Sequence, residues 1–468
     1  MSAPLNSKKV LIVAGEFPPI KTIGRIRTAK FTQHLRNYGW TPIILSIEPT
    51  AETYDSSLEN EIATGIQVYR VPKPDIEKFL VNKIKKILGK TEKNKALHTS
   101  ATITDLKLHP TNHENQGSSN KLFNACLNLF KNLLKYIIYL PDDYNVWAYN
   151  ANKIADQICK EHNISIVYTS LPPFSACHIG YKIKKKHNIP WVVDYRDLWY
   201  GDVLREWIPL VRQKLELILE KFYMRQADVI ISVSEQKTEY LKKLHPTTKA
   251  RWETVTNGYD TEIFEPLLAL PRKKDQYINF VYTGRLFKNR RGYAFAEALG
   301  QLCLEDFSLK DRVRVHILGG VSPEIKARYD EILTSYDIKL TYIFTGDIGY
   351  QQSMEAQVNA DYLLLIVDTG ITSDGVIPGK LFEYIASRRP IFALTDPGAT
   401  QEIIAKANVG VVVPAESTEQ CKIKLKAILQ IKPPETIQGD EIYLQQFDRK
   451  KLSEKLADIF NNTINLRE

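Results

Sequence analysis

Short apolar runs alternate with helical patterns along most of this chain of 468 residues. Near-continuous apolar strands separated by helices are typical of parallel sheets covered by helices on both faces. The pattern therefore predicts an α/β protein with doubly wound parallel sheets. The predicted strands are Val10–Ala14, Pro42–Ser46, Ile166–Thr169, Trp191–Asp194, Val229–Val233, Ile278–Thr283, Arg314–Leu318, Tyr342–Thr345, Tyr362–Ile366, Ile391–Leu394 and Gly410–Val413.

The strands fall into two series, which predicts two Rossmann-like domains facing a cleft. A chain of this length also exceeds what one hydrophobic core supports. The Pro- and charge-containing stretch Phe264–Gln276 is interpreted as the interdomain connection. We expect an N-terminal domain at residues 1–265, a C-terminal domain at 266–445, and an amphipathic terminal helix within 446–468.

Residues of about 75–140 interrupt this alternation of strands and helices. A polar stretch at 91–119 is flanked by two basic amphipathic stretches, at 79–90 and 121–138. Two interpretations remain open. The apolar stripes pack against the first domain, as most amphipathic helices do, or they lie on an anionic membrane.

Composition excludes several classes of protein. A content of 44% hydrophobic and 25% charged residues argues against wholesale disorder, and no apolar run approaches the roughly 20 residues that span a bilayer. The first apolar run is too short for a signal peptide, so we expect a cytoplasmic location. The five cysteines form no CxxC pair, which argues against a disulfide framework or a zinc site. A net charge of +9 suits acidic partners without choosing among them.

The segment Pro378–Tyr384 places a cation and a carboxylate at the start of a predicted helix. Lys380 and Glu383 lie three residues apart, on one face. A helix N-terminus favours anions, and a carboxylate accepts hydrogen bonds from vicinal hydroxyls. The face therefore suits a ribose diphosphate, with a solvated ion pair as the alternative.

Three further polar clusters follow predicted strands, where open α/β sheets bind ligands. The loop Gly15–Arg27 lacks the GxGxxG fingerprint of dinucleotide enzymes, but its Gly24, Arg25 and Arg27 suit an acceptor phosphate. The turn after the fourth predicted strand holds Asp194, Arg196 and Asp197, which either pair with one another or orient a reacting hydroxyl. The basic loop after Thr283 suits a diphosphate leaving group. Its four cations are Arg285, Lys288, Arg290 and Arg291.

Together these motifs resemble the retaining glycosyltransferases of GT-B fold known as glycosyltransferase family 4. The resemblance extends over most of the chain, and Pro141-Asp142 with Trp147 resembles a bacterial subgroup that builds surface polysaccharides. The landmarks are Val10–Gly24, Tyr195–Trp199, Ala227–Ser234, Thr256–Asp260, Gly284–Leu286, Phe344–Gly346 and Pro378–Tyr384.

The resemblance implies a nucleoside-diphosphate sugar bound by the C-terminal domain and a glycan or lipid-linked acceptor bound by the first. Arg285 and a basic neighbour (Lys288, Arg290 or Arg291) match the family's pair on the diphosphate, and Glu383 matches the carboxylate on the ribose. The Asp194–Asp197 turn would lie between donor and acceptor. The resemblance also implies retention of anomeric configuration, no metal or other cofactor, and a terminal helix that crosses back to the first domain.

The sequence departs from the family pattern at two places. The first of the family's paired glutamates falls at Gly375, beside Asp374, which is the remaining candidate for that sugar contact. The first loop has Ile23-Gly24 where a double glycine is usual. We expect a hexosyl- or N-acetylhexosaminyltransferase, located in the cytoplasm or at the inner face of its membrane. The alternatives are a sugar-nucleotide epimerase of similar architecture and a non-enzymatic protein that binds anionic membranes.

Overall fold

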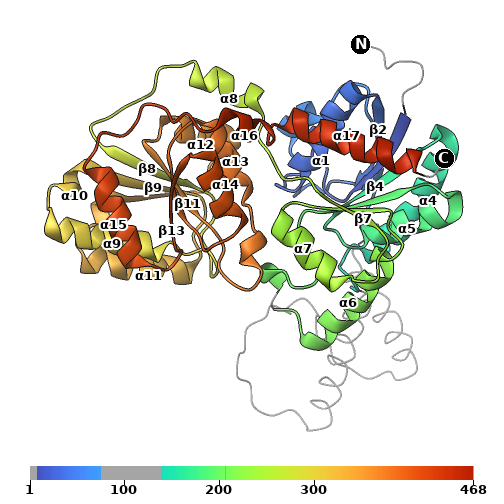
Figure 1. Cartoon of the computed structure of the whole chain (residues 1–468), viewed down its shortest axis with the longest axis horizontal. Helices are drawn as coiled ribbons and strands as arrows, with labels where there is room; N and C mark the ends of the chain where they lie inside the picture. Colours follow the sequence, from blue (N-terminus) through green and yellow to red (C-terminus); the bar gives the residue numbers. More distant parts are fainter. Residues whose placement is uncertain (1–7, 75–138, 206, 467–468) are drawn as a thin grey trace, which may run out of the picture.

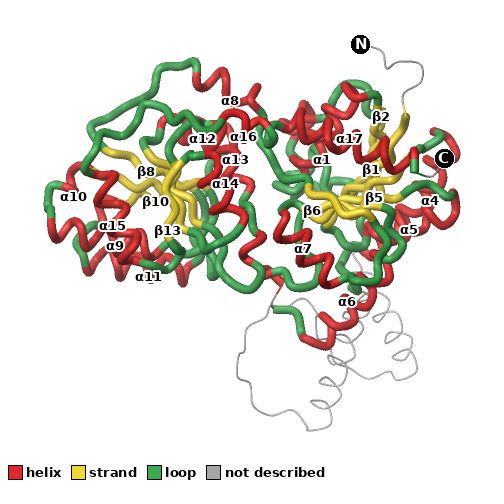
Figure 2. Tube along the Cα trace, in the orientation of Figure 1, coloured by secondary structure: helices red, strands yellow, loops and turns green. Residues whose placement is uncertain are grey.

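The computed structural model describes residues 8–74, 139–205 and 207–466, which form two α/β domains (Figure 1). Each domain is a parallel sheet with helices on both faces (Figure 2), so the predicted fold class is confirmed. The sequence-predicted insertion at 75–140 lies almost entirely outside the described residues.

The N-terminal domain contains a seven-stranded parallel sheet. The strand order reverses direction between β1 and β4, which is the switch point where open α/β sheets place their ligands. In sheet order the strands are β3 (Gln67–Val71), β2 (Trp40–Ile47), β1 (Lys8–Ala14), β4 (Ile166–Leu171), β5 (Trp191–Tyr195), β6 (Val229–Ser232) and β7 (Arg251–Thr254).

Two edge strands of this sheet, β3 and β7, are absent from the sequence prediction. Their sequences alternate polar and apolar residues and are only partly buried, whereas the central strands are buried throughout. An edge strand needs fewer apolar residues because one side of it faces solvent. The signal that identified the central strands is therefore weak at the edges.

Two layers of helices cover the N-terminal sheet. One core packs α4 (Asn145–His162), α5 (Ala176–His187), α6 (Leu210–Met224) and α7 (Glu235–Leu244) on one face. The other core packs α1 (Arg25–His34) and α17 (Arg449–Asn465) on the opposite face. Short 3-10 helices lie at η1 (Leu35–Tyr38), η2 (Ser56–Glu61) and η3 (Val203–Arg205).

The C-terminal domain contains a six-stranded parallel sheet, in the order β10 (Tyr342–Gly346), β9 (Val313–Leu318), β8 (Ile278–Thr283), β11 (Tyr362–Ile366), β12 (Ile391–Leu394) and β13 (Gly410–Val413). One face carries α9 (Tyr293–Glu305), α10 (Leu309–Arg312), α11 (Pro323–Ser335), η4 (Lys339–Thr341) and α15 (Thr418–Leu429). The other carries α8 (Thr261–Leu268), α12 (Tyr350–Asn359), η5 (Ser373–Gly375), α13 (Gly379–Ala386), α14 (Ala399–Ala407) and α16 (Glu441–Gln445).

The chain crosses between the domains twice. Phe264 of α8 packs with Met354 and Val358 of the C-terminal domain, so the first crossing precedes α8 and lies before the stretch 264–276 that the sequence suggested. The second crossing leads into α17, which lies against α1 of the N-terminal domain (Figure 1). Phe460 of α17 packs edge-on against Trp40, with ring centroids 5.2 Å apart. Among the residues described, no helix has the length and apolar character needed to cross a membrane.

Candidate functional site

The C-terminal ends of β8 and β9 meet the start of α13 in the C-terminal domain. Gly284 and Gly319 follow the two strands with φ angles of 123° and 146°, a region that favours glycine. A Cβ on Gly319 would lie 2.2 Å from the carbonyl oxygen of Gly284, so the two loops approach this closely because residue 319 is a glycine. Space is open at the front of α13, where a Cβ on Gly379 would touch nothing within 4 Å.

Lys380 extends from the first turn of α13 into this junction. Its Nζ is enclosed, has no hydrogen-bond partner, and lies 4.0 Å from the centroid of the Tyr282 ring. It also lies over Gly284, where a Cβ would be 2.4 Å away. Burial, with the nearby charge of Arg290, lowers the pKa of the Lys380 ammonium well below its usual range. An enclosed cation at a helix N-terminus is a ready site for a bound anion.

Glu383 lies one turn further along α13. Its carboxylate accepts a hydrogen bond of 3.3 Å from Gln357 Nε2. Burial raises the pKa of the Glu383 carboxyl, although the Gln357 hydrogen bond and the positive charges of Arg449 and Lys380 oppose the rise. The arrangement of Lys380 and Glu383 is therefore not a solvated ion pair, because burial disfavours the charged form of both groups.

The four cations of the loop after β8 do not converge on one point. Arg290 pairs with the buried Asp368, whose second oxygen has no partner. Arg285 is 73% exposed and pairs with Asp347 at 2.9 Å. Another exposed pair, also at 2.9 Å, joins Arg291 to Glu416. Lys288 is exposed. Of the four, Arg290 is the residue whose charge the structure brings next to Lys380.

Gly375 stands where the family 4 pattern has the first of its paired glutamates, and the structure gives a reason for the glycine. A Cβ at this position would lie 2.7 Å from Cγ of Lys237, which belongs to the other domain, so a glutamate does not fit this domain arrangement. The carbonyl oxygen of Gly375 instead accepts a 2.8 Å hydrogen bond from Ser234 Oγ. Asp374 is exposed, and its carboxylate accepts a hydrogen bond from the Gly375 amide.

In the N-terminal domain, Arg27 and Asp194 are paired with each other and buried. Arg27 donates to both carboxylate oxygens of Asp194, at 2.9 and 2.8 Å, and to the carbonyl oxygens of Val255 and Thr256. Asp194 is 0% exposed and also accepts a hydrogen bond from Tyr168. In this arrangement the pair supports the site from within the domain, and the predicted roles of Asp194 in catalysis and of Arg27 in acceptor binding stay predictions.

Arg25 and Arg196 are likewise engaged within the domain. Arg25 donates two hydrogen bonds to Glu61, of 3.0 and 2.8 Å, and its predicted contact with an acceptor phosphate stays a prediction. Arg196 donates to the carbonyl oxygens of Gly24 and Pro172, and thereby ties together two loops at the carboxyl edge of the sheet. A Cβ on Gly24 would lie 1.8 Å from Glu16 Oε2 and 2.2 Å from Arg196 Nη1, so both side chains would have to move for a larger residue.

Asp197 is the exposed carboxylate of the turn after β5. Beyond it lies a cavity of about 230 Å³ that the sequence prediction missed. Burial raises the pKa of Asp202 in this cavity, and the charge of Asp197 adds to the rise. The cavity is lined by Trp199, Tyr200, Gly201, Asp202, Arg205, Ile208, Gln213, Glu216 and, from the C-terminal domain, Ile371. Its location beside Asp197 suits an acceptor.

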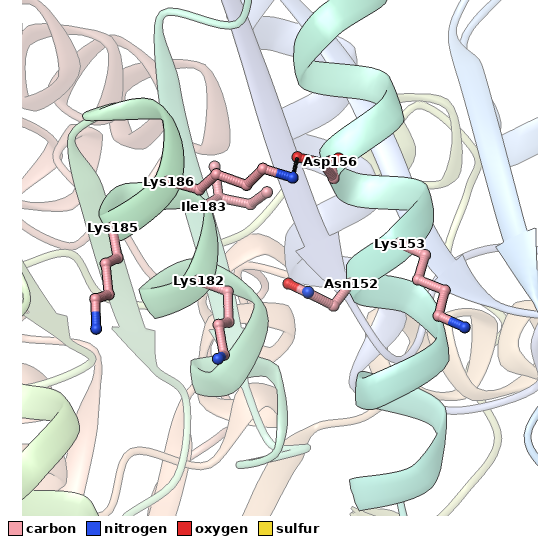
Figure 3. Close-up of a pocket in the computed structure, with 7 residues that line it drawn as sticks. All are labelled: Asn152, Lys153, Asp156, Lys182, Ile183, Lys185 and Lys186. Atoms are coloured by element: carbon pink, nitrogen blue, oxygen red, sulfur yellow. Dashed lines mark ion pairs between the residues drawn. The ribbon is translucent and has the colours of Figure 1, made fainter.

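A second cavity lies within the N-terminal domain, between α4 and α5 (Figure 3). Lysines dominate its lining, and Asp156 pairs there with Lys186 at 2.7 Å. No group of three histidine, cysteine or acidic side chains within the described part of the chain is placed to hold a metal ion.

Comparison with known proteins agrees with this architecture. The model for Glycosyltransferase Family 4 matches residues 130–263. Sucrose-phosphate synthase from Thermosynechococcus elongatus superposes with a TM-score of 0.62 at 13% identity, over 98% of this chain and 100% of that one. A glycosyltransferase from Rickettsia africae gives 0.60 at 16% identity, over 98% and 99% of the two chains. No curated protein sequence matches this chain.

A third solved structure, Anabaena HepE in complex with UDP and glucose, gives a TM-score of 0.59 at 13% identity, over 97% of this chain and 100% of that one. At such identities the superpositions show a shared fold, and the family model shows the relationship at residues 130–263. The chain therefore has the GT-B fold that the motifs suggested, and its residues 130–263 match the Glycosyltransferase Family 4 model, in agreement with the resemblance.

Proposed function

We propose that this chain transfers a sugar from a nucleoside-diphosphate sugar to a glycan or lipid-linked acceptor, with retention of anomeric configuration, in surface-polysaccharide synthesis. The observation that carries the donor site is the enclosed, unpartnered ammonium of Lys380 at the start of α13. An anion at this point removes the cost of an unpaired buried cation. A diphosphate is such an anion, and it gains negative charge as its bond to the sugar breaks.

Arg285 is proposed to join Lys380 on the diphosphate when the donor binds. Its ion pair with Asp347 is exposed, and such pairs contribute at most about 1 kcal/mol, so leaving Asp347 costs little. Lys288, Arg290 and Arg291 are proposed to add positive charge from the same loop, with Arg290 held in place by Asp368. In this proposal these side chains neutralise the diphosphate, and neither a metal nor another cofactor is required.

Glu383 is proposed to hold the ribose, because the hydrogen bond that its carboxylate accepts from Gln357 is long, at 3.3 Å, and the carboxylate can accept others from vicinal hydroxyls. Asp374 is kept as the candidate for the sugar contact. Across the domain interface, Asp197 is proposed to orient the acceptor hydroxyl, since it is the exposed carboxylate at the end of β5. Arg196 positions the loops around it, with Gly24 allowing their close approach.

UDP-sugars are the first donors to test, because neighbouring folds include HepE in complex with UDP-glucose and an E. coli protein bound with UDP-2-fluoro glucose. We propose a hexosyl or N-acetylhexosaminyl donor and action at the inner face of the cytoplasmic membrane. The test is thermal unfolding of the purified protein with a panel of UDP-, GDP-, ADP- and TDP-sugars, since a ligand that binds the folded state raises the melting temperature.

At least one sugar nucleotide should stabilise wild-type protein and fail to stabilise Lys380→Met. The control variant is Lys339→Met, which removes an exposed lysine from the same domain. An absence of any shift with the whole panel would contradict the proposed donor site. Product analysis by NMR with the stabilising donor then determines whether the anomeric configuration is retained.

A further inference from the structure

The acidic side chains of helix α6 point into the N-terminal domain. Its two acidic residues, Glu216 and Glu220, are 2% and 0% exposed. Glu216 accepts hydrogen bonds from Arg212 at 2.8 Å and from the indole of Trp199 at 3.1 Å, and it also pairs with Arg205. Glu220 accepts a 2.9 Å hydrogen bond from Tyr195. Both acids of the helix are therefore committed to the domain interior.

The outer side of α6 is apolar. Apart from the adjacent pair at its start, its exposed apolar side chains recur at three- and four-residue intervals, which places them on one face over a length of about 20 Å. They are Leu210 at 74%, Val211 at 75%, Leu215 at 51%, Ile218 at 66% and Phe222 at 43% exposure, and Trp207 at 79% lies just before the helix. We call this set the α6 face. A contiguous exposed apolar face of this kind marks an interaction surface.

The charges around the α6 face are positive. Lys214 and Arg225 are exposed on or beside the helix, and no acidic residue of α6 points outward. On the adjacent helix α5, the ring of Tyr181 contacts Phe222 at 5.2 Å, and Lys185 lies 5.9 Å from that ring. Lys182 and Lys185 also line the cavity of Figure 3, where Asp156 pairs with Lys186 and leaves these two lysines without an acidic partner among the described residues.

We propose that the α6 face, with Lys182 and Lys185 beside it, docks on an anionic lipid bilayer. An apolar stripe flanked by cations, on a helix whose two acidic side chains are buried, matches the boundary between acyl chains and anionic headgroups. The excess of cations beside the apolar stripe is complementary in charge to anionic headgroups, and it is the reason for choosing a bilayer as the occupant.

Docking in this way would also place the acceptor cavity close to the bilayer surface. That cavity is lined by Gln213 and Glu216 of α6 and by Arg205 and Ile208, which precede the helix. A lipid-linked acceptor could then occupy the cavity with its polar head while its chain stays in the bilayer. This step rests on the proposed function, whereas docking of the α6 face does not.

The test is co-sedimentation of the full chain with phosphatidylcholine vesicles that contain or lack phosphatidylglycerol, in the absence of any sugar nucleotide. We expect binding to the anionic vesicles, and a loss of at least about tenfold in the partition coefficient for Leu215→Gln/Ile218→Gln. The matched control is Leu304→Gln/Ile423→Gln, which removes apolar side chains of 54% and 52% exposure from the C-terminal domain and should bind as wild type.

A second variant, Lys182→Glu/Lys185→Glu, separates charge from apolar contact. It should lose most of the preference for phosphatidylglycerol, and wild-type binding should weaken as salt is raised. Unchanged binding by Leu215→Gln/Ile218→Gln, or no binding of wild type to anionic vesicles, would overturn the proposal.

Two further measurements identify other occupants of the α6 face. A fall in the melting temperature of Leu215→Gln/Ile218→Gln would show that other parts of this chain cover the face. Wild-type dimers that the same variant converts to monomers in gel filtration would assign the face to a second copy. Either result would overturn docking on a bilayer. Donor binding, measured separately by thermal shift, remains a test of the proposed function alone.

Discussion

Arg27 and Asp194 form a two-bond ion pair inside the N-terminal domain, with Nε–Oδ2 and Nη2–Oδ1 distances of 2.9 and 2.8 Å. The same guanidinium donates to the carbonyl oxygens of Val255 and Thr256, where the chain leaves β7 for the other domain. One buried side chain thus connects the first helix, the end of β5 and the start of the interdomain crossing.

Breaking this pair should destabilise the protein without weakening donor binding. Removing one partner of a buried ion pair typically costs about 3–5 kcal/mol, because the other charge is left uncompensated. We expect Arg27→Met to lower the free energy of unfolding of the N-terminal domain by that order, measured by denaturant titration. The double variant Arg27→Met/Asp194→Leu should recover part of the loss. Equal stability of wild type and Arg27→Met would argue that the pair is not structural.

Replacing Lys380 should separate binding from stability. Hydrogen bonds to charged groups contribute about 1.5–3 kcal/mol, so Lys380→Met should weaken nucleoside-diphosphate affinity by roughly 10- to 100-fold in calorimetry. The free energy of unfolding should not fall, because the variant removes an enclosed ammonium that has no hydrogen-bond partner. A variant that unfolds more easily and binds as tightly as wild type would refute this role.

Donor binding should take up a proton at Lys380. Burial lowers the pKa of this ammonium in the empty site, and a bound diphosphate raises it again. Affinity should therefore be highest below the empty-site pKa and fall as pH rises from that value toward the pKa of the complex. Calorimetry in two buffers of different ionisation enthalpy measures the proton uptake, which Lys380→Met should abolish.

Because of the same lowered pKa, the stability of the ligand-free protein should change with pH in the direction opposite to that of donor affinity. The unfolded chain binds the Lys380 proton more tightly than the folded chain does, so this group's contribution to the free energy of unfolding rises with pH up to the normal lysine range. Denaturant titrations of wild type and Lys380→Met over this range isolate the contribution. We expect the difference in free energy of unfolding between the two proteins to shrink as the pH rises.

We expect Glu383 to make the protein bind a ribose more tightly than a sugar that lacks the 2′ and 3′ hydroxyls. Wild type should bind UDP more tightly than 2′,3′-dideoxyuridine diphosphate, whereas Glu383→Ala should bind the two with similar affinity, a loss of discrimination of about 1.5–3 kcal/mol. The comparison is a double-mutant cycle between side chain and ligand, so a general loss of affinity cancels. Undiminished discrimination in the variant would place the ribose elsewhere.

Gly375 should control how closely the two domains approach. A Cβ would lie 2.7 Å from Lys237 Cγ across the interface, and overpacking of this kind costs about 1–3 kcal/mol. Gly375→Ala should therefore favour a more open arrangement, seen as a larger radius of gyration in small-angle scattering. Ser234→Ala is the control, because it removes the 2.8 Å hydrogen bond to Gly375 without adding atoms.

The sequence predicted the fold because its central strands are buried on both faces and read as continuous apolar runs. Edge strands β3 and β7 were missed because they are half-exposed and mixed in composition. The site was harder to predict from composition alone. A loop containing Arg25 and Arg27 reads as a basic surface, and only the fold brings Glu61 and Asp194 against those side chains. Likewise, nothing local shows that Lys380 lacks a partner, since that depends on Gly284 and Tyr282.

The two interdomain crossings run side by side and are bonded to each other. Tyr259 donates its amide to the carbonyl oxygen of Phe447 at 3.1 Å, and the amide of Arg449 donates to the carbonyl oxygen of Tyr259 at 3.0 Å. Two connecting segments that are hydrogen-bonded to each other resist sliding and twisting of one domain against the other. They still permit the domains to bend about the bonded point. The two domains should therefore rotate relative to each other about a single hinge axis at Tyr259. The angle between the domains would then set the distance between Lys380 and Asp197.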